Sequence, residues 1–482
     1  MAEAQNNVRI AHRKEWQTMT PAPAVTAAGA FVINDNLNVH RFSLYVLSAT
    51  VHYLYDHQND DWIPIASGAF GTAIAAGACG TFSDWGGTIT ATGGSTTTVT
   101  VNVASFNING FAVGSVIEFL SGTAANIGLR RTILSIKHPG ENTGTITLTL
   151  DSAVTSVANN DTFRIGSGTF FVLMPGTLGA TSFRKYDIAL GLWTSCTQTG
   201  LPATWGTDGR MVAPGMLNVS YDTGTADIDS SATSLECDGK AWTVDQWINY
   251  QVRITAGTGA GQIRVITDND ADTLTIATGT DLDETSVFVI EGDENAIYLL
   301  GNNNIAMYKY SISANSWSTL APTAARGGAP VAGMSADFVG KTGDAGWAAI
   351  TDIRDGRYIY SFRGATAVLD RFDIAGGTAG AGAWTVITYH PVLVTFAAGA
   401  SSEWDKTKIY IAKEGSATVP QRIYAFDVVE NSFNAIATDW YLGGAALIGN
   451  KIWIENLSSA ALVKWLYVLQ STSANLRRIM IF

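Results

Sequence analysis

Histidines and clustered aspartates are the first residues of this sequence to consider as metal ligands. The histidines are His12, His40, His52, His57, His138 and His390. Only His52 and His57 lie close together, with Asp56, Asp60 and Asp61 beside them. No cysteine pair of the C-x₂₋₄-C type accompanies them, as a zinc-finger site would require. We therefore expect a solvated turn at this position and no metal site.

A second candidate for metal binding is "TDNDAD", Thr267 to Asp272, whose alternating aspartates resemble the start of a calcium-binding loop. Such a loop requires glycine at its sixth position and an acidic residue at its twelfth. Counted from Asp268, these positions hold Thr273 and Gly279. The sequence therefore favours a polar hairpin turn over a calcium site.

The glycines of "GTGAGQIRVI", Gly257 to Ile266, could cradle a phosphate if a helix followed them. The residues after them alternate as in a strand instead. No nucleophile elbow is present, and no pair of glycosidase carboxylates can be chosen from the acidic residues, which mostly lie at expected turns. We expect no enzyme and no cofactor, with a propeller-type glycan hydrolase or lyase as an open alternative.

Several tryptophans could stack on sugars if they were exposed. These are Trp85, Trp205, Trp247, Trp347 and Trp404. Packing in a core is the alternative for each of them. We retain Trp85, Trp205 and Trp247 as candidate binding residues.

The N-terminus is locally basic and contains Arg9, Arg13, Lys14 and Trp16. These residues could dock onto an acidic neighbouring protein. A frayed terminus is the alternative.

A repeated spacing of aromatic residues indicates the elements that would position such groups. In "MYKYSISANSWSTLAP", Tyr310 and Ser311 precede Trp317. The same pattern gives the sets Tyr55, Asp56 and Trp62; Tyr186, Asp187 and Trp193; Phe372, Asp373 and Trp384; and Phe426, Asp427 and Phe433. The fourth copy has a glycine- and alanine-rich insertion, and a degenerate sixth copy places Leu469 and Gln470 before Leu476.

This unit has a simple physical interpretation. The aromatic residues pack at a strand end and between adjacent sheets, while the aspartate or serine binds backbone N–H groups of a tight turn. Because a four-stranded sheet cannot bury both faces alone, copies would stack radially. The pattern resembles the kelch-type β-propeller repeat, although the glycine pair of that family is missing. The resemblance implies an all-β, about six-bladed kelch-like propeller.

The spacing of the turn residues indicates two insertions. Successive turn residues are 131, 124, 62, 54 and 43 positions apart, whereas a blade needs about 45–55 residues. The first two intervals each contain strand-like segments that resemble one another. We predict a small β-barrel or sandwich module in each, at roughly 94–167 and 221–292.

The predicted organisation divides the whole chain into six segments. It comprises an N-terminal arm (1–28), blade 1 and the start of blade 2 (29–93), the first module (94–167), blade 2 and the start of blade 3 (168–220), the second module (221–292), and blades 3–6 (293–482). We expect residues 29–36 to close the ring by pairing with the C-terminal strand "RRIMIF".

Composition excludes several classes of protein. Hydrophobic residues make up 46% and charged residues 15% of the 482 residues, which is typical of a packed globular protein. The net charge of −12 disfavours nucleic-acid and anionic-membrane partners, and no apolar run is long enough for membrane insertion. The three separated cysteines (Cys79, Cys196 and Cys237) predict free thiols, and no signal peptide is visible.

The chain, with threonine-, glycine- and alanine-rich strands and small β-modules inside a larger β-scaffold, resembles virion proteins of tailed bacteriophages. The resemblance includes the "GxGxGQxRxI…N…ADTLTI" hairpin of the second module. The resemblance implies a non-enzymatic structural or attachment protein of the virion: a tail fibre or spike, a neck or collar appendage, or a capsid decoration. Its expected partners are other virion proteins and a host-surface glycan, in an assembly with many copies. A kelch-like protein- or glycan-binding module is the alternative.

Overall fold

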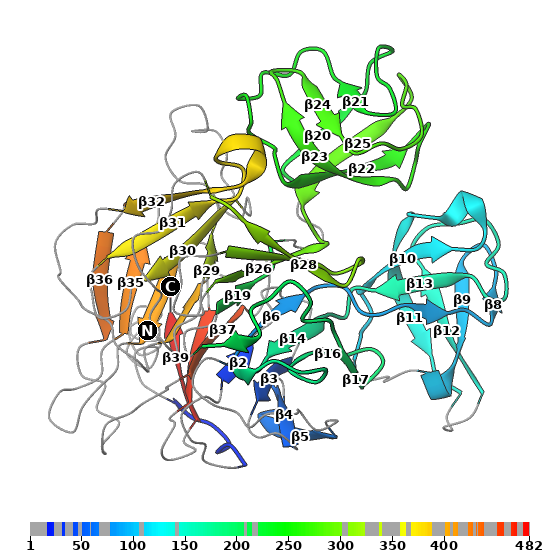
Figure 1. Ribbon diagram of the computed structural model, residues 1–482. Helices are drawn as coiled ribbons and strands as arrows, with labels where there is room; N and C mark the ends of the chain where they lie inside the picture. The colour runs from blue at the N-terminus through cyan, green and yellow to red at the C-terminus, as the bar shows by residue number, and fades with distance from the viewer. Residues whose placement is uncertain are drawn as a thin grey trace, which may run out of the picture.

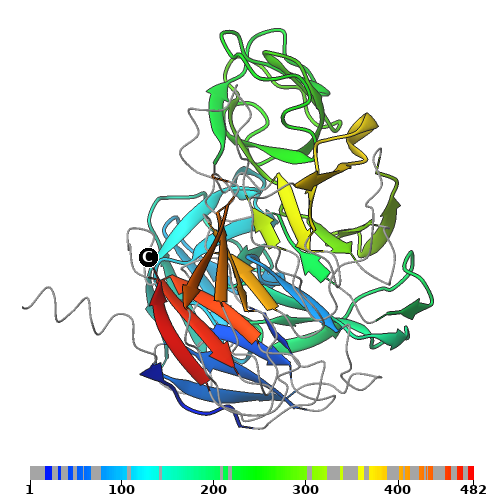
Figure 2. The same cartoon turned by 90° about the vertical axis from the view of Figure 1, so that its left-hand side faces the viewer.

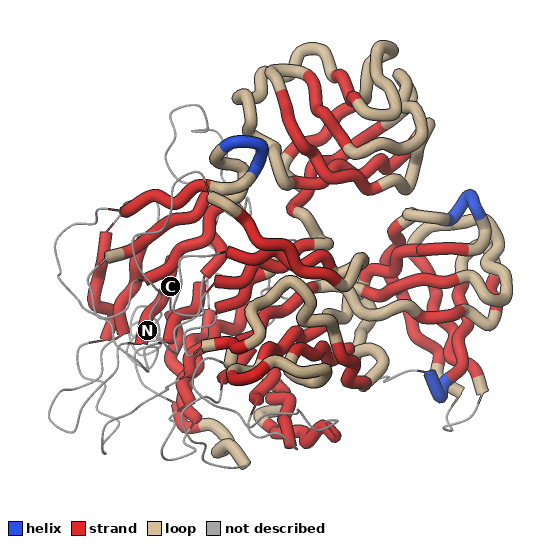
Figure 3. The backbone as a smooth tube through the Cα atoms, viewed as in Figure 1, coloured by secondary structure: helices blue, strands red, loops and turns tan. Residues whose placement is uncertain are grey.

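The protein is all-β in the part of the chain that the computed structural model describes. Apart from three short 3-10 helices, its regular elements there are strands (Figure 3). The described residues are 17–23, 31–33, 42–46, 51–57, 59–66, 78–105, 110–139, 144–206, 210–214, 220–300, 307–322, 337–339, 357–362, 368–387, 401–404, 408–412, 423–427, 430, 432–437, 451–456, 464–469 and 476–481.

Six of the sheets each contain four antiparallel strands, and we number them in chain order (Figure 1). Sheet 1 consists of β2 (Phe31–Ile33), β3 (Phe42–Val46), β4 (Val51–Asp56) and β5 (Asp61–Ala66). Sheet 2 consists of β6 (Cys79–Ser83), β14 (Thr169–Leu173), β16 (Phe183–Asp187) and β17 (Leu192–Ser195). Sheet 3 consists of β19 (Arg210–Val212), β26 (Ala296–Leu300), β27 (Met307–Ser311) and β28 (Ser316–Leu320).

The remaining three follow the same plan. Sheet 4 consists of β29 (Asp337–Val339), β30 (Tyr358–Phe362), β31 (Leu369–Asp373) and β32 (Ala383–Ile387). Sheet 5 consists of β33 (Ser401–Trp404), β34 (Lys408–Ala412), β35 (Ile423–Asp427) and β36 (Ser432–Ala437). Sheet 6 consists of β37 (Lys451–Asn456), β38 (Lys464–Leu469), β39 (Leu476–Ile481) and the N-terminal β1 (Gln17–Thr18).

Consecutive sheets are neighbours, and sheet 6 also contacts sheet 1. The first strand of sheet 2 lies beside the first strands of sheets 1 and 3, and the first strand of sheet 6 lies beside those of sheets 5 and 1. Sheets 3 and 4 share a hydrophobic cluster, and the first strands of sheets 4 and 5 are adjacent. The view in Figure 2 shows these sheets below the green sheet at the top.

The repeated aromatic residues are direct cross-strand partners in five sheets. Each pair joins the third and fourth strands, and the pairs are Tyr55 with Trp62, Tyr186 with Trp193, Tyr310 with Trp317, Phe372 with Trp384 and Phe426 with Phe433. In the first four pairs the ring centroids are 4.8, 5.2, 4.9 and 5.1 Å apart. The spacing in the sequence is therefore a hairpin register, as the packing interpretation predicts.

Each of the four tryptophans also packs against the preceding sheet. Trp62 contacts the cluster that contains Tyr467 and Leu476 of sheet 6, and Trp193 lies with Leu44 of sheet 1. Trp317 and Trp384 occupy the same places between sheets 2 and 3 and between sheets 3 and 4. The predicted role between adjacent sheets is confirmed.

The aspartate or serine after each aromatic residue binds the turn that follows. Carboxylate oxygens of Asp187 and Asp427 accept hydrogen bonds from the backbone N–H three residues later, at 2.8 and 3.0 Å. Asp56 and Ser311 accept the equivalent bond at 3.3 Å, and Asp373 accepts one from Ala375 at 3.0 Å. This part of the prediction is confirmed as well.

The strand that joins the two chain ends differs from the predicted one. Within residues 29–36, β2 pairs with β3 of its own sheet. The strand that pairs with β39 is β1, through Gln17 with Arg478 and Thr18 with Arg477. Met19 and Ala22 are buried beyond it in the cluster of sheets 6 and 1. Part of the predicted arm therefore belongs to sheet 6.

The same finding corrects the sixth copy of the motif. Leu469 pairs with Leu476, but this pair joins the second and third strands of sheet 6. The fourth strand of that sheet comes from the N-terminus.

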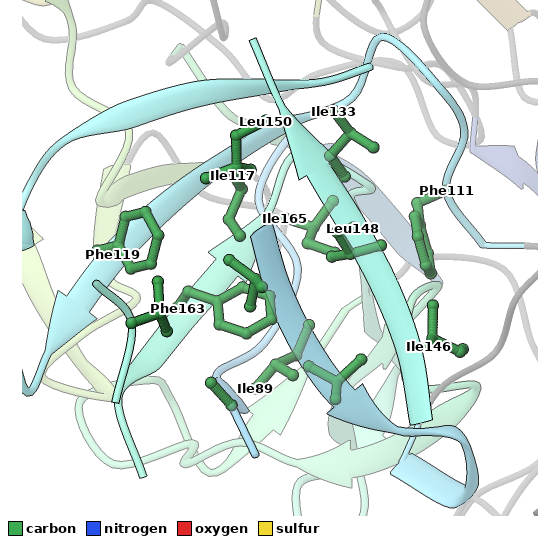
Figure 4. Packing of buried hydrophobic residues seen from close by; sticks show 14 of the residues in the cluster. Ile89, Phe111, Ile117, Phe119, Ile133, Ile146, Leu148, Leu150, Phe163 and Ile165 are labelled. Atoms are coloured by element: carbon green, nitrogen blue, oxygen red, sulfur yellow. The ribbon is translucent and has the colours of Figure 1, made fainter. Parts of the chain in front are cut away.

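Two larger sheets are inserted into sheets 2 and 3, each between the first and second strands (Figure 1). The first inserted sheet has seven strands: β7 (Ile89–Thr90), β8 (Gly93–Gly94), β9 (Thr98–Asn102), β10 (Val116–Ser121), β11 (Arg130–Lys137), β12 (Thr145–Leu150) and β13 (Thr162–Ile165). It curls as a half-barrel around a core of aliphatic and aromatic side chains (Figure 4).

The second inserted sheet has six strands: β20 (Asp222–Thr225), β21 (Ser234–Glu236), β22 (Tyr250–Ala256), β23 (Ile263–Asn269), β24 (Thr273–Ile276) and β25 (Val287–Gly292). Its own hydrophobic cluster includes Trp242, Trp247 and Phe288. The exact domain boundaries given above remain predictions.

Candidate functional site

The three tryptophans proposed for sugar stacking are buried. Trp85, Trp205 and Trp247 are only 5%, 1% and 1% exposed. Trp205 and Trp247 belong to hydrophobic clusters, so the predicted sugar-binding role of all three is wrong for the folded chain. Trp347 and the side chain of Trp404 lie outside the described residues.

The candidate residues of the N-terminus, Arg9, Arg13, Lys14 and Trp16, also lie outside the described residues. Their predicted docking role stays a prediction. In the sequence, Trp16 precedes Thr20 by the same four positions that separate Trp193 from Thr197.

His52 and His57 do not lie in a solvated turn. His52 is fully buried in β4, and its ring centroid lies 5.1 Å from that of Trp193 in sheet 2. His57 packs between Tyr55 and Tyr467 of sheet 6. Burial, with a smaller contribution from the nearby Arg184, lowers the pKa of His52 to about 4, and burial together with Arg478 lowers that of His57 to about 3.

The "TDNDAD" segment forms the turn between β23 and β24, where the backbone N–H of Asp270 bonds to Thr273 at 3.0 Å. The polar hairpin that the sequence favoured is therefore confirmed. Among the described residues, no group of three or more His, Cys, Asp or Glu side chains could hold a metal ion. The described chain also contains no helix long and apolar enough to cross a membrane.

The motif "GxGxGQxRxI" forms a turn of the second inserted sheet and hydrogen-bonds the loops around it. Its glycines form the turn between β22 and β23 with positive φ angles. Gln262 Oε1 accepts hydrogen bonds from Arg264 and from the backbone N–H of Thr280. Arg264 donates in turn to the carbonyl of Ala232 at 3.0 Å, so the motif holds the surrounding loops together.

The most unusual polar arrangement is a buried cluster of three arginines and three glutamates, which we call the charge cluster. Its members are Glu118, Arg130, Arg164, Arg253, Glu291 and Glu294. In the first inserted sheet, Glu118 on β10 lies directly between Arg130 on β11 and Arg164 on β13. Its two oxygens bind these arginines at 2.7 and 2.9 Å.

The charge cluster joins the two inserted sheets. Arg130 reaches Glu294 at 2.8 Å and Glu291 at 3.4 Å, although these glutamates lie at and just after the end of β25. Arg164 also lies 3.4 Å from Glu294. Arg253 on β22 binds Glu291 at 2.6 Å.

An aromatic side chain completes the cluster. The guanidinium carbons of Arg164 and Arg130 lie 4.1 and 4.9 Å from the ring centroid of Trp85. Such cation–π contacts are strongest where water is excluded. Trp85 therefore packs under the charges rather than on the protein surface.

Burial and pairing set the proton affinities inside the charge cluster. Burial alone would lower the pKa of Arg130, but Glu294, Glu291 and Glu118 more than offset this and raise it. The pKa of Glu294 is raised because its burial outweighs the attraction of Arg130 and Arg164. The pKa of Glu291 is lowered, since hydrogen bonding to Arg253 and the charge of Arg130 outweigh its burial.

The backbones of the two inserted sheets also meet. A Cβ atom added to Gly128, in the turn before β11, would collide with the backbone of Gly261, in the turn before β23. Both glycines have positive φ angles, at 76° and 89°. The two equivalent hairpin turns are therefore in direct contact, and neither tolerates a larger residue.

The glycine- and alanine-rich insertion of the fourth motif docks onto the second inserted sheet. It contains the short helix η3 (Thr378–Gly380). Asn249 donates hydrogen bonds through Nδ2 to the carbonyls of Ile374 and Gly380, at 2.6 and 3.0 Å. Arg357 binds Asp373 through two contacts of 2.9 Å and donates to the carbonyl of Gln246.

The charge cluster is suited to holding the two inserted sheets together. Each arginine of the charge cluster is paired with a carboxylate. The cysteines Cys79, Cys196 and Cys237 are free and buried, as the sequence predicts. Burial raises the pKa of the Cys196 and Cys237 thiols, which makes them poor nucleophiles.

No protein-family profile matches the chain, and no curated protein is significantly similar to it.

Proposed function

We propose that this chain is a non-enzymatic structural platform that holds two β-modules in a fixed orientation. The observation that carries the proposal is the charge cluster, in which Arg130 of one inserted sheet is paired with Glu291 and Glu294 beside the other. Breaking such a buried network is costly because it leaves uncompensated charges. Loosely tethered binding modules would have no need of it.

We also propose that sheets 1 to 6 are the blades of a six-bladed kelch-like propeller. In support, consecutive sheets are neighbours, sheet 6 contacts sheet 1 through β37 and β2, and β1 from the N-terminus completes sheet 6. A strand from the N-terminus that completes the last blade ties the two ends of the chain together, as in a closed propeller ring. A closed ring is stiff, which is the property that a platform requires.

The setting that fits best is the particle of a tailed bacteriophage. The resemblance of the chain to virion proteins supports this assignment, as do its free cysteines and its small β-modules within a larger β-scaffold. The propeller would contact neighbouring subunits, and the inserted sheets would extend toward other virion proteins or a host-surface glycan.

The location can be tested by imaging. A peptide tag between Asp151 and Ser152, which are both exposed on the first inserted sheet, would be labelled with gold in purified phage particles. We expect regularly spaced label on the tail, neck or head. Complete particles without the protein would contradict the proposal.

Two alternative functions predict different results for the purified protein. Saturable binding on a glycan array, without any product and without incorporation into particles, would favour a kelch-like binding module. Release of oligosaccharides from host polysaccharide would favour a glycan hydrolase or lyase.

A further inference from the structure

The two inserted sheets share the same local structure around one turn. In the first inserted sheet, the N–H of Gly114 donates to Ile133 at 2.8 Å, and that of Ser115 to Ala112 at 3.0 Å. In the second, the N–H of Asn249 donates to Ile266 at 3.0 Å, and that of Tyr250 to Trp247 at 3.0 Å. The segments 112–115 and 247–250 are therefore equivalent. Gly114 and Asn249 both have positive φ angles, at 95° and 65°.

In the second inserted sheet this segment is an established interface. Ile248 is only 5% exposed. The turn of sheet 4 that covers it, "IAGGTAGAGA" (374–383), contains no charged residue. A Cβ atom on Gly380 of that turn would lie 2.7 Å from Ile248 Cγ2, so the contact requires a residue without a side chain. Asn249 adds the two hydrogen bonds to backbone carbonyls described above.

In the first inserted sheet the equivalent segment is open. Val113, the counterpart of Ile248, is 60% exposed, and Leu134 next to Ile133 is 55% exposed. Ala112 is exposed as well, and a Cβ atom on Gly114 would meet no other atom. We call these four residues, Ala112, Val113, Gly114 and Leu134, the Val113 surface.

The difference has a topological reason. The second inserted sheet is covered by the enlarged turn of the next sheet in the chain, sheet 4. The first inserted sheet belongs to sheet 2, and the corresponding turn of sheet 3 spans only Ile312 to Asn315 between β27 and β28. The chain thus supplies the covering turn for one inserted sheet and not for the other.

We propose that the Val113 surface binds an uncharged, glycine- and alanine-rich turn of a partner protein. The chemistry of the occupant follows from the turn that covers Ile248. Small residues permit close backbone approach, and two exposed aliphatic side chains gain from leaving water. The proposal does not depend on whether the chain belongs to a virus particle.

A hairpin peptide provides the probe. It would contain residues 369–387 of this chain, closed by a disulfide between added terminal cysteines, and would be titrated into the full-length protein with labelled Val and Leu methyl groups. We expect saturable chemical-shift changes at Val113 and Leu134. Val113→Asp should abolish them, and Gly114→Asn should tighten binding about threefold or more by restoring a hydrogen bond to the turn.

Two controls distinguish specific binding at the Val113 surface from nonspecific binding of the peptide. Ile228→Asp, at a 73% exposed position of the other inserted sheet, should leave the titration unchanged. A peptide with Gly380→Lys should not bind, because the side chain would fill the space of the contact.

The proposal is wrong if the wild-type peptide gives no saturable shift, or if Val113→Asp and the lysine peptide bind as the originals do. It is also wrong if the methyl shifts of Val113 depend on protein concentration without peptide and this dependence disappears in Val113→Asp. That result would identify a second copy of the chain as the occupant.

Discussion

Individual tryptophans stabilise the boundary between neighbouring sheets. Trp317 Nε1 donates to the carbonyl of Thr197 in the segment after sheet 2, at 3.0 Å, and Trp62 makes the same bond to Thr20 at 3.1 Å. The N–H groups of Thr197 and Thr20 donate in return to Asn315 and Asp60. This reciprocal contact recurs at two boundaries between neighbouring sheets.

We predict that Trp317→Ala lowers the free energy of unfolding by about 3–5 kcal/mol, because it leaves a large cavity and removes this hydrogen bond. Chemical denaturation of the purified variant measures the loss. Ser316→Ala, at the exposed neighbouring position, is the control and should stay within about 0.5 kcal/mol of the wild type. Equal losses in both variants would contradict the packing role.

Arg130 is the residue on which the charge cluster depends most. We predict that Arg130→Met costs about 3–5 kcal/mol of stability, since three buried carboxylates lose their common partner. Arg131→Met is the matched control, because Arg131 donates only to the backbone carbonyls of Arg130 and Ala153 in the bonds that the structure describes. If the two variants lose stability equally, the charge cluster does not hold the sheets together.

The two buried histidines make the fold sensitive to acid. Their pKa values are about 4 and about 3 in the folded chain, against 6.5 for an unperturbed histidine. Below pH 6.5 the unfolded state therefore binds protons that the folded state does not, and stability falls as the pH falls toward 4.

The predicted loss is on the order of 3 kcal/mol per histidine. Denaturation curves between pH 7.5 and 4.5 measure it, and His52→Gln combined with His57→Gln should flatten the slope in this range. An unchanged slope in the double variant would show that other groups control the acid response.

At the level of elements, β1 is a short strand with a large structural effect. It completes sheet 6, and the residues after it are buried against sheet 1 or bonded to Asp60. We predict that deleting residues 1–20 costs at least about 2 kcal/mol more than deleting residues 1–12, because Met19 leaves the core. Thermal denaturation compares the two deletions, and equal melting temperatures would refute the role of β1.

The hairpins were predictable from sequence, and the contacts between distant elements were not. The spacing of Tyr310 and Trp317 reflects a register within one hairpin, which is local information. The pairing of β1 with β39 joins opposite ends of the chain, and no local pattern distinguishes it from a pairing of β2.

The burial of polar residues was also not predictable from the sequence. Glu118 in "SVIEFL" stands alone among apolar residues, which is a weak signal of a buried charge, but its partners Arg130 and Arg164 are identified only by the folded sheet. Trp85 was a candidate for sugar stacking, but in the fold Arg130 and Arg164 lie over its ring.

For the whole molecule, we propose that the two inserted sheets form one rigid unit with the four-stranded sheets. Three sets of contacts act together: the charge cluster, the meeting of Gly128 with Gly261, and the docking of η3 on Asn249. Contacts within one rigid unit are energetically coupled. Removing one set by mutation should therefore increase the motion of the inserted sheets relative to the four-stranded sheets.

The most direct test is a distance distribution between the inserted sheets. Spin labels would be attached to Ser152→Cys and Thr278→Cys, two exposed positions, in a variant whose three buried cysteines are replaced by alanine or serine, and measured by pulsed electron–electron double resonance. We expect one narrow distance that broadens when Arg130→Met is added. A broad distribution before that substitution would contradict it.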